Sequence, residues 1–236
     1  MCRVILHIYK GLKHFADSGF SDYLCGMYNE SDFILSKHER WNFNSSQPIF
    51  FTADTHFYDK NAMEKSDRPF SSIEEMNEIL IENWNRVVPE DGIVFHLGDF
   101  CCGGKKGWSH ITSALNGKIY LILGNHDYTN IRAGYNWWFE EVLQQKYIRI
   151  HGQPILLNHY PFLCYEHENK GTWQLFGHVH SAPHANGMDI PRLNMLFPSQ
   201  YDVGVDNNGF TPVSFEHVKS IIERQRAMAE GSITAQ

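Results

Sequence analysis

The sequence has few cysteines, and they form no recognisable metal or disulfide pattern. There are five, no two are spaced as C-x-x-C, and Cys101 and Cys102 are adjacent. Zinc ribbons use paired C-x-x-C motifs, and small disulfide-rich domains use an even set of cysteines. The sequence therefore favours neither class of protein.

Long apolar runs are also missing. No stretch approaches the roughly 18 consecutive apolar residues that a membrane-spanning helix needs. The short apolar run at residues 4–9 contains His7, stops at Lys10 and is followed by no small-residue cleavage site, so it does not match a signal peptide. We therefore expect a cytoplasmic protein that does not associate with a membrane.

The chain has no excess of basic residues. Lys and Arg number 20 against 27 Asp and Glu, which gives a formal net charge of -7. Proteins that bind nucleic acid through a broad basic face need many Lys and Arg contacts with phosphates. We expect no stable nucleic-acid binding, although bound metal ions could still create a local positive site. The sequence does not indicate an oligomeric state.

The length and composition predict one sizeable domain with additions at both ends. A chain of 236 residues with 42% apolar residues is too short for two comfortable domains. Residues 1–47 have mixed polarity and weak periodicity, so we expect an N-terminal extension of uncertain structure, either a loose tail or a partner-binding segment. Residues 48–228 form the predicted catalytic domain, and residues 229–236 a flexible C-terminal tail.

The first half of the domain alternates strands and helices, which is typical of a largely parallel sheet. A helix should begin after Ser71 or Ser72, with Glu74 or Glu75 completing the cap, and should end before Pro89. A shorter helix is predicted at residues 108–115. Strands are predicted at residues 49–53, 93–97 and 119–123.

The second half has a different pattern, with a helix near residues 137–144 followed by consecutive strands. These strands, at residues 147–150, 154–157, 173–176 and 201–205, suggest antiparallel pairing in a second sheet. A closing helix is predicted at residues 215–226, capped by Ser214. The loops at residues 160–172 and 181–200 follow polar blocks, so they could contact a substrate or simply lie on the surface.

Five short polar blocks follow the strand-like runs, and together they indicate a two-metal site. Residues two apart in a strand share a face, so each pair separated by one residue could converge on an ion. Imidazole nitrogens with carboxylate and amide oxygens suit manganese, iron, zinc, nickel or cobalt better than soft thiolate-binding metals. The blocks are Asp54-Thr55-His56, Gly98-Asp99, Gly124-Asn125-His126-Asp127, Asn158-His159 and Gly177-His178-Val179-His180.

These blocks resemble the pattern of the calcineurin-like metallophosphoesterase superfamily, D-x-H, G-D, G-N-H-D/E, a single H and G-H-x-H. The resemblance runs from Ile49 to Ile222 and includes Asp67-Arg68-Pro69-Phe70 and Val203-Gly204-Val205-Asp206, as in small bacterial and phage members. It implies an α/β fold, a four-layer α-β-β-α sandwich of two mixed sheets flanked by helices. It also implies a metal-dependent phosphoesterase.

The resemblance assigns the ligands of two divalent ions, for which Mn²⁺ is the first expectation. It implies that Asp54, His56 and His180 hold one ion. It likewise implies that Asn125, His159 and His178 hold the other, with Asp99 bridging them. A hydroxide shared by ions roughly 3.5–4 Å apart would attack phosphorus directly.

Further residues of these blocks are candidates for contact with the substrate. His126 should point away from Asn125, so it could stabilise the transition state or protonate the leaving oxygen, with Asp127 orienting it. Asn125, His126 and Tyr160 are candidate substrate contacts, and Tyr165 and Trp173 are further possibilities. His96 has a structural or supporting role in this interpretation.

Two other segments have competing interpretations. Residues 103–107, Gly-Gly-Lys-Lys-Gly, lack the order of a phosphate-binding loop, which favours a flexible surface loop. Residues 137–139, Trp-Trp-Phe, are expected to pack in the core, with base stacking as the alternative.

The predicted function is hydrolysis of a small phosphodiester or phosphomonoester. The block around Gly98 and Asp99 departs from the G-D-x-x-D-R-G of protein phosphatases, which argues against a phosphoprotein substrate. Hydrolysis of a nucleoside diphosphate derivative at its pyrophosphate is one alternative. A non-catalytic binding module with the same fold is the other.

Overall fold

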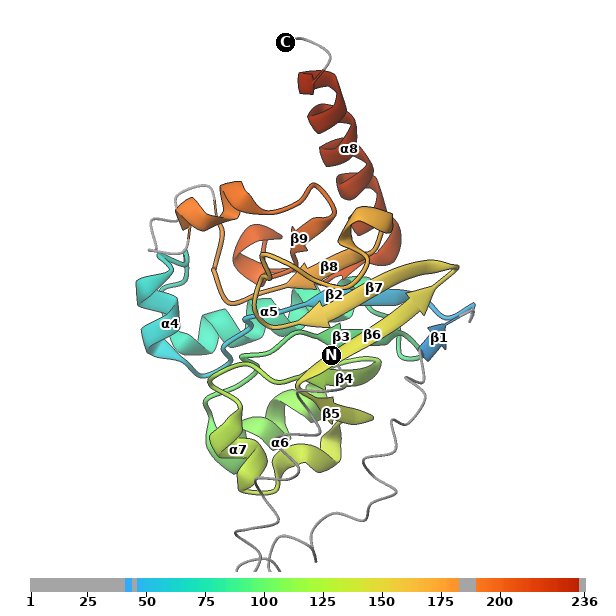
Figure 1. Ribbon diagram of the computed structural model, residues 1–236. Coiled ribbons are helices and arrows are strands. Elements are labelled where there is room, and N and C mark those ends of the chain that lie inside the picture. The colour runs from blue at the N-terminus through green and yellow to red at the C-terminus, as the bar shows by residue number, and fades with distance from the viewer. Residues whose placement is uncertain (1–40, 44–45, 183–189, 234–236) are drawn as a thin grey trace, which may run out of the picture. The chain divides into compact units, whose positions relative to one another are not determined.

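The computed structural model describes residues 41–43, 46–182 and 190–233 (Figure 1). Most of the predicted extension and part of the 181–200 loop therefore lie outside the described residues. The described chain forms two five-stranded sheets with helices. Both sheets are mixed, so the predicted α/β class with two mixed sheets and flanking helices is confirmed.

The first sheet contains the strands predicted in the first half of the domain. Its order is β10-β2-β3-β4-β5, in which β2 to β5 are parallel and β10 is antiparallel to β2. Because the parallel strands share one direction, their carboxyl ends meet at one edge of the sheet. The strands are β2 (Ile49–Thr52), β3 (Ile93–His96), β4 (Lys118–Ile122), β5 (Glu141–Leu143) and β10 (Val213–Ser214).

The second sheet corrects the predicted antiparallel pairing. Its order is β1-β6-β7-β8-β9, and only the β6–β7 hairpin is antiparallel. The loops before β8 and β9 cross back to the starting edge of the sheet, so these strands pair in parallel. The strands are β1 (Trp41–Phe43), β6 (Gln145–Ile150), β7 (Gln153–Asn158), β8 (Trp173–Phe176) and β9 (Gln200–Asp202). β1 falls within residues 1–47, where no strand was predicted.

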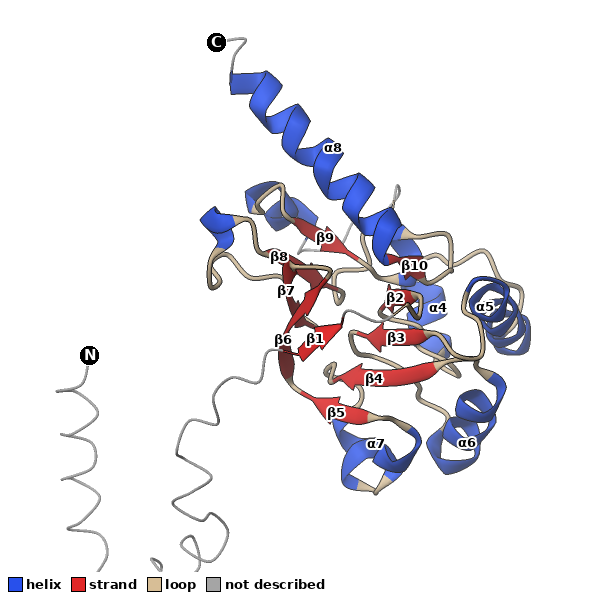
Figure 2. Ribbon diagram, turned by 90° about the vertical axis from the view of Figure 1, so that its right-hand side faces the viewer, coloured by secondary structure: helices blue, strands red, loops and turns tan. Residues whose placement is uncertain are grey.

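Alternating side chains of the first sheet divide the core into two apolar clusters. Phe51 and Phe95 face the second sheet, whereas Phe50 and Val94 face the helices. The helix-side cluster includes Trp84 and residues of two helices, α5 (Ile73–Val87) and α6 (Gly104–Ala114). Figure 2 shows these helices on the face of the sheet that is turned away from β6 to β9.

The long helix α5 matches its prediction. The Ser72 side chain accepts a hydrogen bond from the backbone N–H of Glu75, and the helix ends two residues before Pro89. Its buried residues Met76, Leu80 and Trp84 lie on one face, as the spacing predicts. The helix therefore covers the first sheet and ends where its sequence signals stop.

Three short helical segments complete the part of the fold near the polar blocks. α4 (Lys60–Lys65) follows β2, α7 (Tyr128–Arg132) follows β4, and the 3₁₀ segment η4 (Val205–Asn207) follows β9. Two further 3₁₀ turns, η2 (Glu168–Lys170) and η3 (Ile190–Met195), lie in the loops before β8 and β9. These connections surround the carboxyl ends of the strands.

The helix predicted at residues 137–144 is absent. Residues Tyr135–Trp138 form the 3₁₀ turn η1, and residues 141–143 form the edge strand β5. Pairing of β5 with β4 satisfies the backbone groups that a helix would have used. Only Phe139 of the three aromatic residues is buried, whereas Trp137 is 65% exposed, so the core-packing interpretation of residues 137–139 is wrong for Trp137.

Two other predicted boundaries are wrong. The predicted surface loop at residues 103–107 forms the cap and first turn of α6, because buried Trp108 and Ile111 fix that helix against the sheet. α8 (Phe215–Ile233) continues past the predicted end at residue 226 and through most of the predicted flexible tail. Residues 223–230 are mostly good helix formers, and one glycine costs only about 1 kcal/mol relative to alanine.

α8 closes one end of the space between the sheets. Phe215, Val218 and Ile222 belong to the inter-sheet cluster, and the helix contacts β10, β2 and β9. Its later turns run out beyond the sheets (Figure 1). None of the helices in the described ranges combines the length and apolar character of a membrane span.

Candidate metal centre

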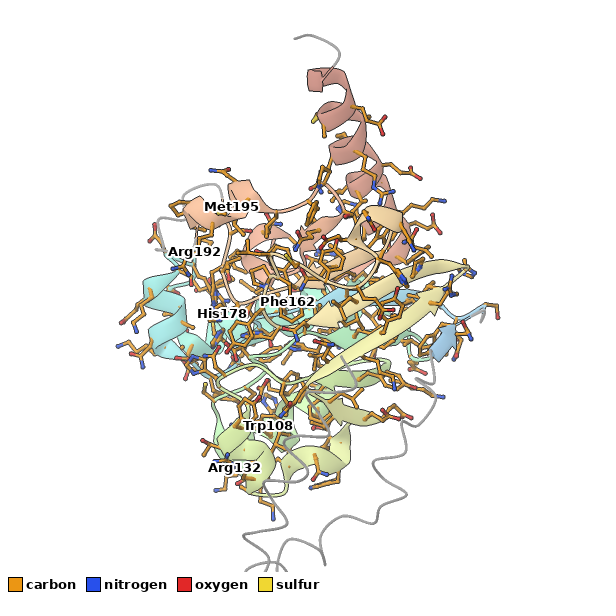
Figure 3. All side chains as sticks on the ribbon, in the orientation of Figure 1. Trp108, Arg132, Phe162, His178, Arg192 and Met195 are labelled. Atoms are coloured by element: carbon orange, nitrogen blue, oxygen red, sulfur yellow. The ribbon has the colours of Figure 1, made fainter. Side chains whose placement is uncertain are left out.

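The predicted ligands gather just beyond the carboxyl ends of five strands. Blocks from the first sheet follow β2, β3 and β4, and blocks from the second sheet follow β7 and β8. The structure brings six of the seven into two groups, in each of which the candidate ligand atoms lie within 4.8 Å of one another. The groups are Asp54, His56 and His180, called the first group, and Asp99, His159 and His178, called the second group. His178 is labelled in Figure 3.

Asp99 lies between the two groups. Its Oδ2 is 3.4 Å from His56 Nε2 in the first group and 3.5 Å from His159 Nε2 in the second. Asn125, the seventh predicted ligand, has its Oδ1 3.1 Å from the same His159 Nε2. A single carboxylate thus lies within 3.5 Å of a histidine nitrogen of each group.

The predicted ligands converge for a different reason from the shared strand face expected from the sequence. Asp54, His56, Asp99, His178 and His180 all follow their strands and have positive φ, between 47° and 73°. They therefore do not converge by sharing one face of a strand, and His178 and His180 enter different groups. Left-handed non-glycine residues cost about 1–3 kcal/mol each and persist only where surrounding contacts hold them. Such strain is concentrated at functional sites.

Two buried atoms of the first group have no hydrogen-bond partner among the described residues. They are Asp54 Oδ1 and His56 Nε2, which both lie within the group. Unpaired buried polar atoms are rare and costly, and a cation between these donors would satisfy both. Burial raises the pKa of Asp54 to about 7, and neighbouring histidines offset only part of this effect. The residues therefore fit a divalent ion.

Each of three candidate histidine ligands is fixed through its Nδ1 atom. His56 Nδ1 lies 3.0 Å from Asp59 Oδ2, and His159 Nδ1 lies 2.8 Å from the carbonyl oxygen of Leu97. His180 Nδ1 lies 2.7 Å from Asp206 Oδ2. These contacts leave Nε2 of each ring for the centre, which is the usual arrangement of metal-binding histidines.

Asp59 and Asp206 were not predicted as site residues. Asp59 carried a weak signal, since it is three residues from His56. Asp206 was noted only as part of a family-like stretch, and its contact with His180 depends on the tertiary fold. Cys102 was also not predicted. Its Sγ donates to Asp59 Oδ2 and lies within 4.8 Å of a His56 ring nitrogen.

Asp127 has a different role from the one predicted. Its carboxylate accepts hydrogen bonds from the backbone N–H groups of Gly124 and Asp99 at 2.8 Å and of Phe100 at 2.9 Å. The side chain is fully buried. Its carboxylate thus fixes the Asp99 loop, and the hydrogen bonds of the described residues include none from it to the His126 ring.

His96 confirms its predicted structural role. Its Nδ1 accepts from the N–H of Gly98, which leaves Nε2–H to donate to Thr55 Oγ1 at 2.9 Å. Thr55 in turn donates to the carbonyl of Phe100 at 2.8 Å. Burial lowers the pKa of His96 to about 3, so the ring is neutral and ties the loops after β2 and β3 together.

His126, Asn125 and Tyr160 form the exposed rim of the centre. The segment Asn125–Asp127 is a turn rather than the extended chain assumed from sequence. The backbone N–H of His126 donates to Asp99 Oδ1, and its ring centre lies 5.1 Å from that of His56. Tyr160 is 42% exposed, donates to Asn125 Oδ1 at 3.3 Å and packs against the His178 ring.

The other two predicted substrate contacts lie elsewhere. Trp173 is buried and stacks on Phe215 in the inter-sheet core, so the prediction for Trp173 is wrong. Tyr165 shares a hydrogen bond with Ser199 at 2.9 Å and thereby fastens the loop after β7 to the segment before β9.

Comparison with known proteins gives the same family as the motifs. Residues 47–182 match the calcineurin-like phosphoesterase family model. An uncharacterized protein of Methanocaldococcus jannaschii is 34% identical over 187 residues, which cover 78% of this chain and 96% of that protein. The gene 66 protein of Mycobacterium phage L5 is 31% identical over 56% of this chain and 77% of its own length.

A solved structure shares the fold. It is a protein of unknown function from Aquifex aeolicus, with a TM-score of 0.57 and 24% sequence identity, and the match covers 74% of this chain and 99% of that one. The matched family region contains all seven predicted ligands. The chain belongs to the calcineurin-like phosphoesterase family of metal-dependent phosphate-ester hydrolases.

Proposed function

We propose that the protein hydrolyses a small phosphodiester or phosphomonoester at a dinuclear metal centre. The observation that carries this proposal is the position of Asp99 between the two groups, within 3.5 Å of a histidine nitrogen on each side. One carboxylate at that position can serve two ions. Asp54, His56 and His180 would hold one, and His159, His178 and Asn125 the other.

The centre would take two divalent ions, with Mn²⁺ first among the metals that suit these donors. Such a pair supplies an activated water for attack on phosphorus and charge to balance the phosphate oxygens. The chain's own contribution is to fix the donors. Two sets of contacts hold the metal-donor atoms in place before the substrate arrives. They are the Nδ1 contacts of three histidines and the three hydrogen bonds that Asp127 accepts from backbone N–H groups.

His126 is the proposed proton donor to the leaving oxygen. Its side chain is exposed, while its backbone N–H is fixed by Asp99. The ring therefore lies next to the first group without belonging to either set of ligands. A histidine at this position can protonate a leaving oxygen or stabilise charge that develops on it.

Asn125 and Tyr160 are the proposed substrate contacts at the rim. The hydroxyl of Tyr160 meets Asn125 Oδ1, and its ring covers one side of His178. A phosphate oxygen entering the centre would lie beside these groups. Burial raises the pKa of Tyr160, so the phenol stays protonated near neutral pH and can donate to an oxygen of the substrate.

A substrate and metal panel tests the proposal. Cyclic nucleotides, linear diesters, monoesters and nucleoside diphosphate derivatives are each assayed with manganese, iron, zinc and nickel. We expect turnover of an ester with at least one metal, and its loss in Asp99→Asn. Asp91→Asn is the matched control, because Asp91 is exposed in the turn before β3, at the opposite end of the strand from the centre.

Each alternative gives a different result in the same panel. Turnover confined to nucleoside diphosphate derivatives would replace ester hydrolysis by pyrophosphate hydrolysis. Two bound ions with no turnover of any compound would favour a non-catalytic binding module. Activity unchanged in Asp99→Asn would contradict the dinuclear mechanism.

A further inference from the structure

The guanidinium of Arg68 is buried beneath the first group and uses all of its donors. Its side chain is 0% exposed and forms a bidentate ion pair with Asp206, at 2.8 and 2.9 Å. The other N–H groups donate to the carbonyls of Asp54 and Thr55 and to the sulfur of Met76. An arginine side chain has five N–H donors, and each has a partner here.

The two carbonyls belong to the strained segment that supplies Asp54 and His56. Both residues have positive φ, of 56° and 48°. Arg68 donates to Asp54 O at 2.6 Å and to Thr55 O at 3.0 Å, which fixes the peptide planes between the two candidate ligands. Arg68 therefore supports the backbone conformation that turns both side chains toward the centre.

The partner of Arg68 supports the third member of the group. Asp206 Oδ2 accepts from Arg68 Nη2 and also lies 2.7 Å from His180 Nδ1. This contact keeps His180 Nε2 directed at the first group.

The second group has different supports. His159 Nδ1 contacts the carbonyl of Leu97, and the Asp99 loop is fixed by Asp127. Within the described part of the chain, the hydrogen bonds of Arg68 and Asp206 do not reach Asp99, His159 or His178. The ion pair thus contacts the first group directly, and its link to the second group runs through Asp54, whose Oδ2 accepts from the N–H of His178 at 2.8 Å.

We propose that the Arg68–Asp206 ion pair is a positioning element for the first metal site alone, acting through the Asp54–His56 backbone and through His180. This inference rests on the proposed dinuclear function. Changes to residues that orient a metal-binding histidine typically weaken metal affinity by roughly 10–100-fold. Loss of the pair should therefore weaken one site and leave the other unchanged.

Titration of metal-free protein with Mn²⁺ by calorimetry, together with Mn²⁺ electron paramagnetic resonance, tests this directly. Wild type should bind two ions and give the signal of a coupled pair. Asp206→Asn should keep one tight ion, bind the second at least about tenfold more weakly, and give the signal of an isolated ion below saturation. The double variant R68Q/D206N removes both buried charges and replaces the single variant if that fails to fold.

Asn85→Ala controls for a general loss of stability. Asn85 donates to Ala114 and accepts from Asn116, near the start of β4 and at the opposite edge of the sheet from the centre. It should lower the melting temperature without changing either metal affinity.

The outcomes separate this inference from the proposed function. Wild type that binds fewer than two ions contradicts the dinuclear function and this inference with it. Wild type with two ions, and variants with either unchanged affinities or equal weakening of both sites, contradicts the selective role of the Arg68–Asp206 pair alone.

Discussion

Single side chains at this centre divide into those that face the ion positions and those that fix them from behind. Asp54, Asp99 and His159 are of the first kind, and Asp127 and Asp206 are of the second. Sequence motifs identify the first kind because their order along the chain is specific. The second kind is harder to find, since Asp206 meets His180 only through the packing of η4 beside the loop after β8.

His126 tests the separation of chemistry from metal binding. We expect His126→Ala to retain both ions and to lose turnover by about 10²–10⁴-fold, the usual contribution of proton transfer by a side chain. The loss should shrink for esters with very good leaving groups, which need no proton. Metal content and kcat for a matched pair of leaving groups provide the measurement. Loss of an ion instead would make His126 a ligand.

Asp127 should matter more for stability than its exposed neighbour. Asp127→Ala leaves three buried N–H groups without an acceptor, each costing about 1–3 kcal/mol. We expect a fall of several kcal/mol in the free energy of unfolding, whereas His126→Ala should stay within about 0.5 kcal/mol as an exposed change. Urea denaturation of metal-free protein compares them. Equal, small effects would show that Asp127 is not structural.

Among the elements, those with a clear period and clear end signals were predictable. α5 has its apolar face, its Ser72 cap and Pro89 beyond its end, and β2, β3 and β4 are short apolar runs bounded by turns. In residues 137–144 the apolar period is not matched by clear end signals. Their apolar residues fit a helix, but the open edge of β4 offers backbone pairing that only the tertiary structure reveals.

The 3₁₀ turn η1 yields a prediction that separates its aromatic residues. Trp137 is 65% exposed and stacks on Trp138 with ring centres 3.9 Å apart, whereas Phe139 is 8% exposed and contacts Phe100 and Trp108. We expect Phe139→Ala to cost about 3–5 kcal/mol and Trp137→Ala about 1 kcal/mol or less. Thermal unfolding measures both. A larger loss of unfolding free energy for Trp137→Ala would show that Trp137 packs in the core.

At the scale of the whole molecule, the motifs and the alternation of elements predicted the α/β class and the two sheets. The parallel pairing of β7, β8 and β9 was not predictable, because the described residues of the connections between them form short 3₁₀ turns rather than the helices that usually mark a crossover. Sequence spacing alone therefore suggested hairpins. The part of α8 beyond residue 226 was also missed.

Metal removal should affect the stability of the entire domain. A ligand that binds only the folded state, at 100 times its dissociation constant, adds about 2.7 kcal/mol. We expect a chelator to lower the melting temperature and Mn²⁺ to restore it in a concentration-dependent way, measured by calorimetry. Asp99→Asn should show a smaller response to Mn²⁺. A melting temperature that changes with neither chelator nor metal would contradict a metal site in the folded state.

The two groups draw on both sheets at once. Asp54 and Asp99 follow strands of one sheet, whereas His159, His178 and His180 follow strands of the other. Each proposed ion would therefore act as a cross-link between the sheets, and a small slide of one sheet past the other would pull both sets of donors apart. A mild change in the inter-sheet core, such as Ile155→Val, should consequently lower the metal affinity while the protein remains folded.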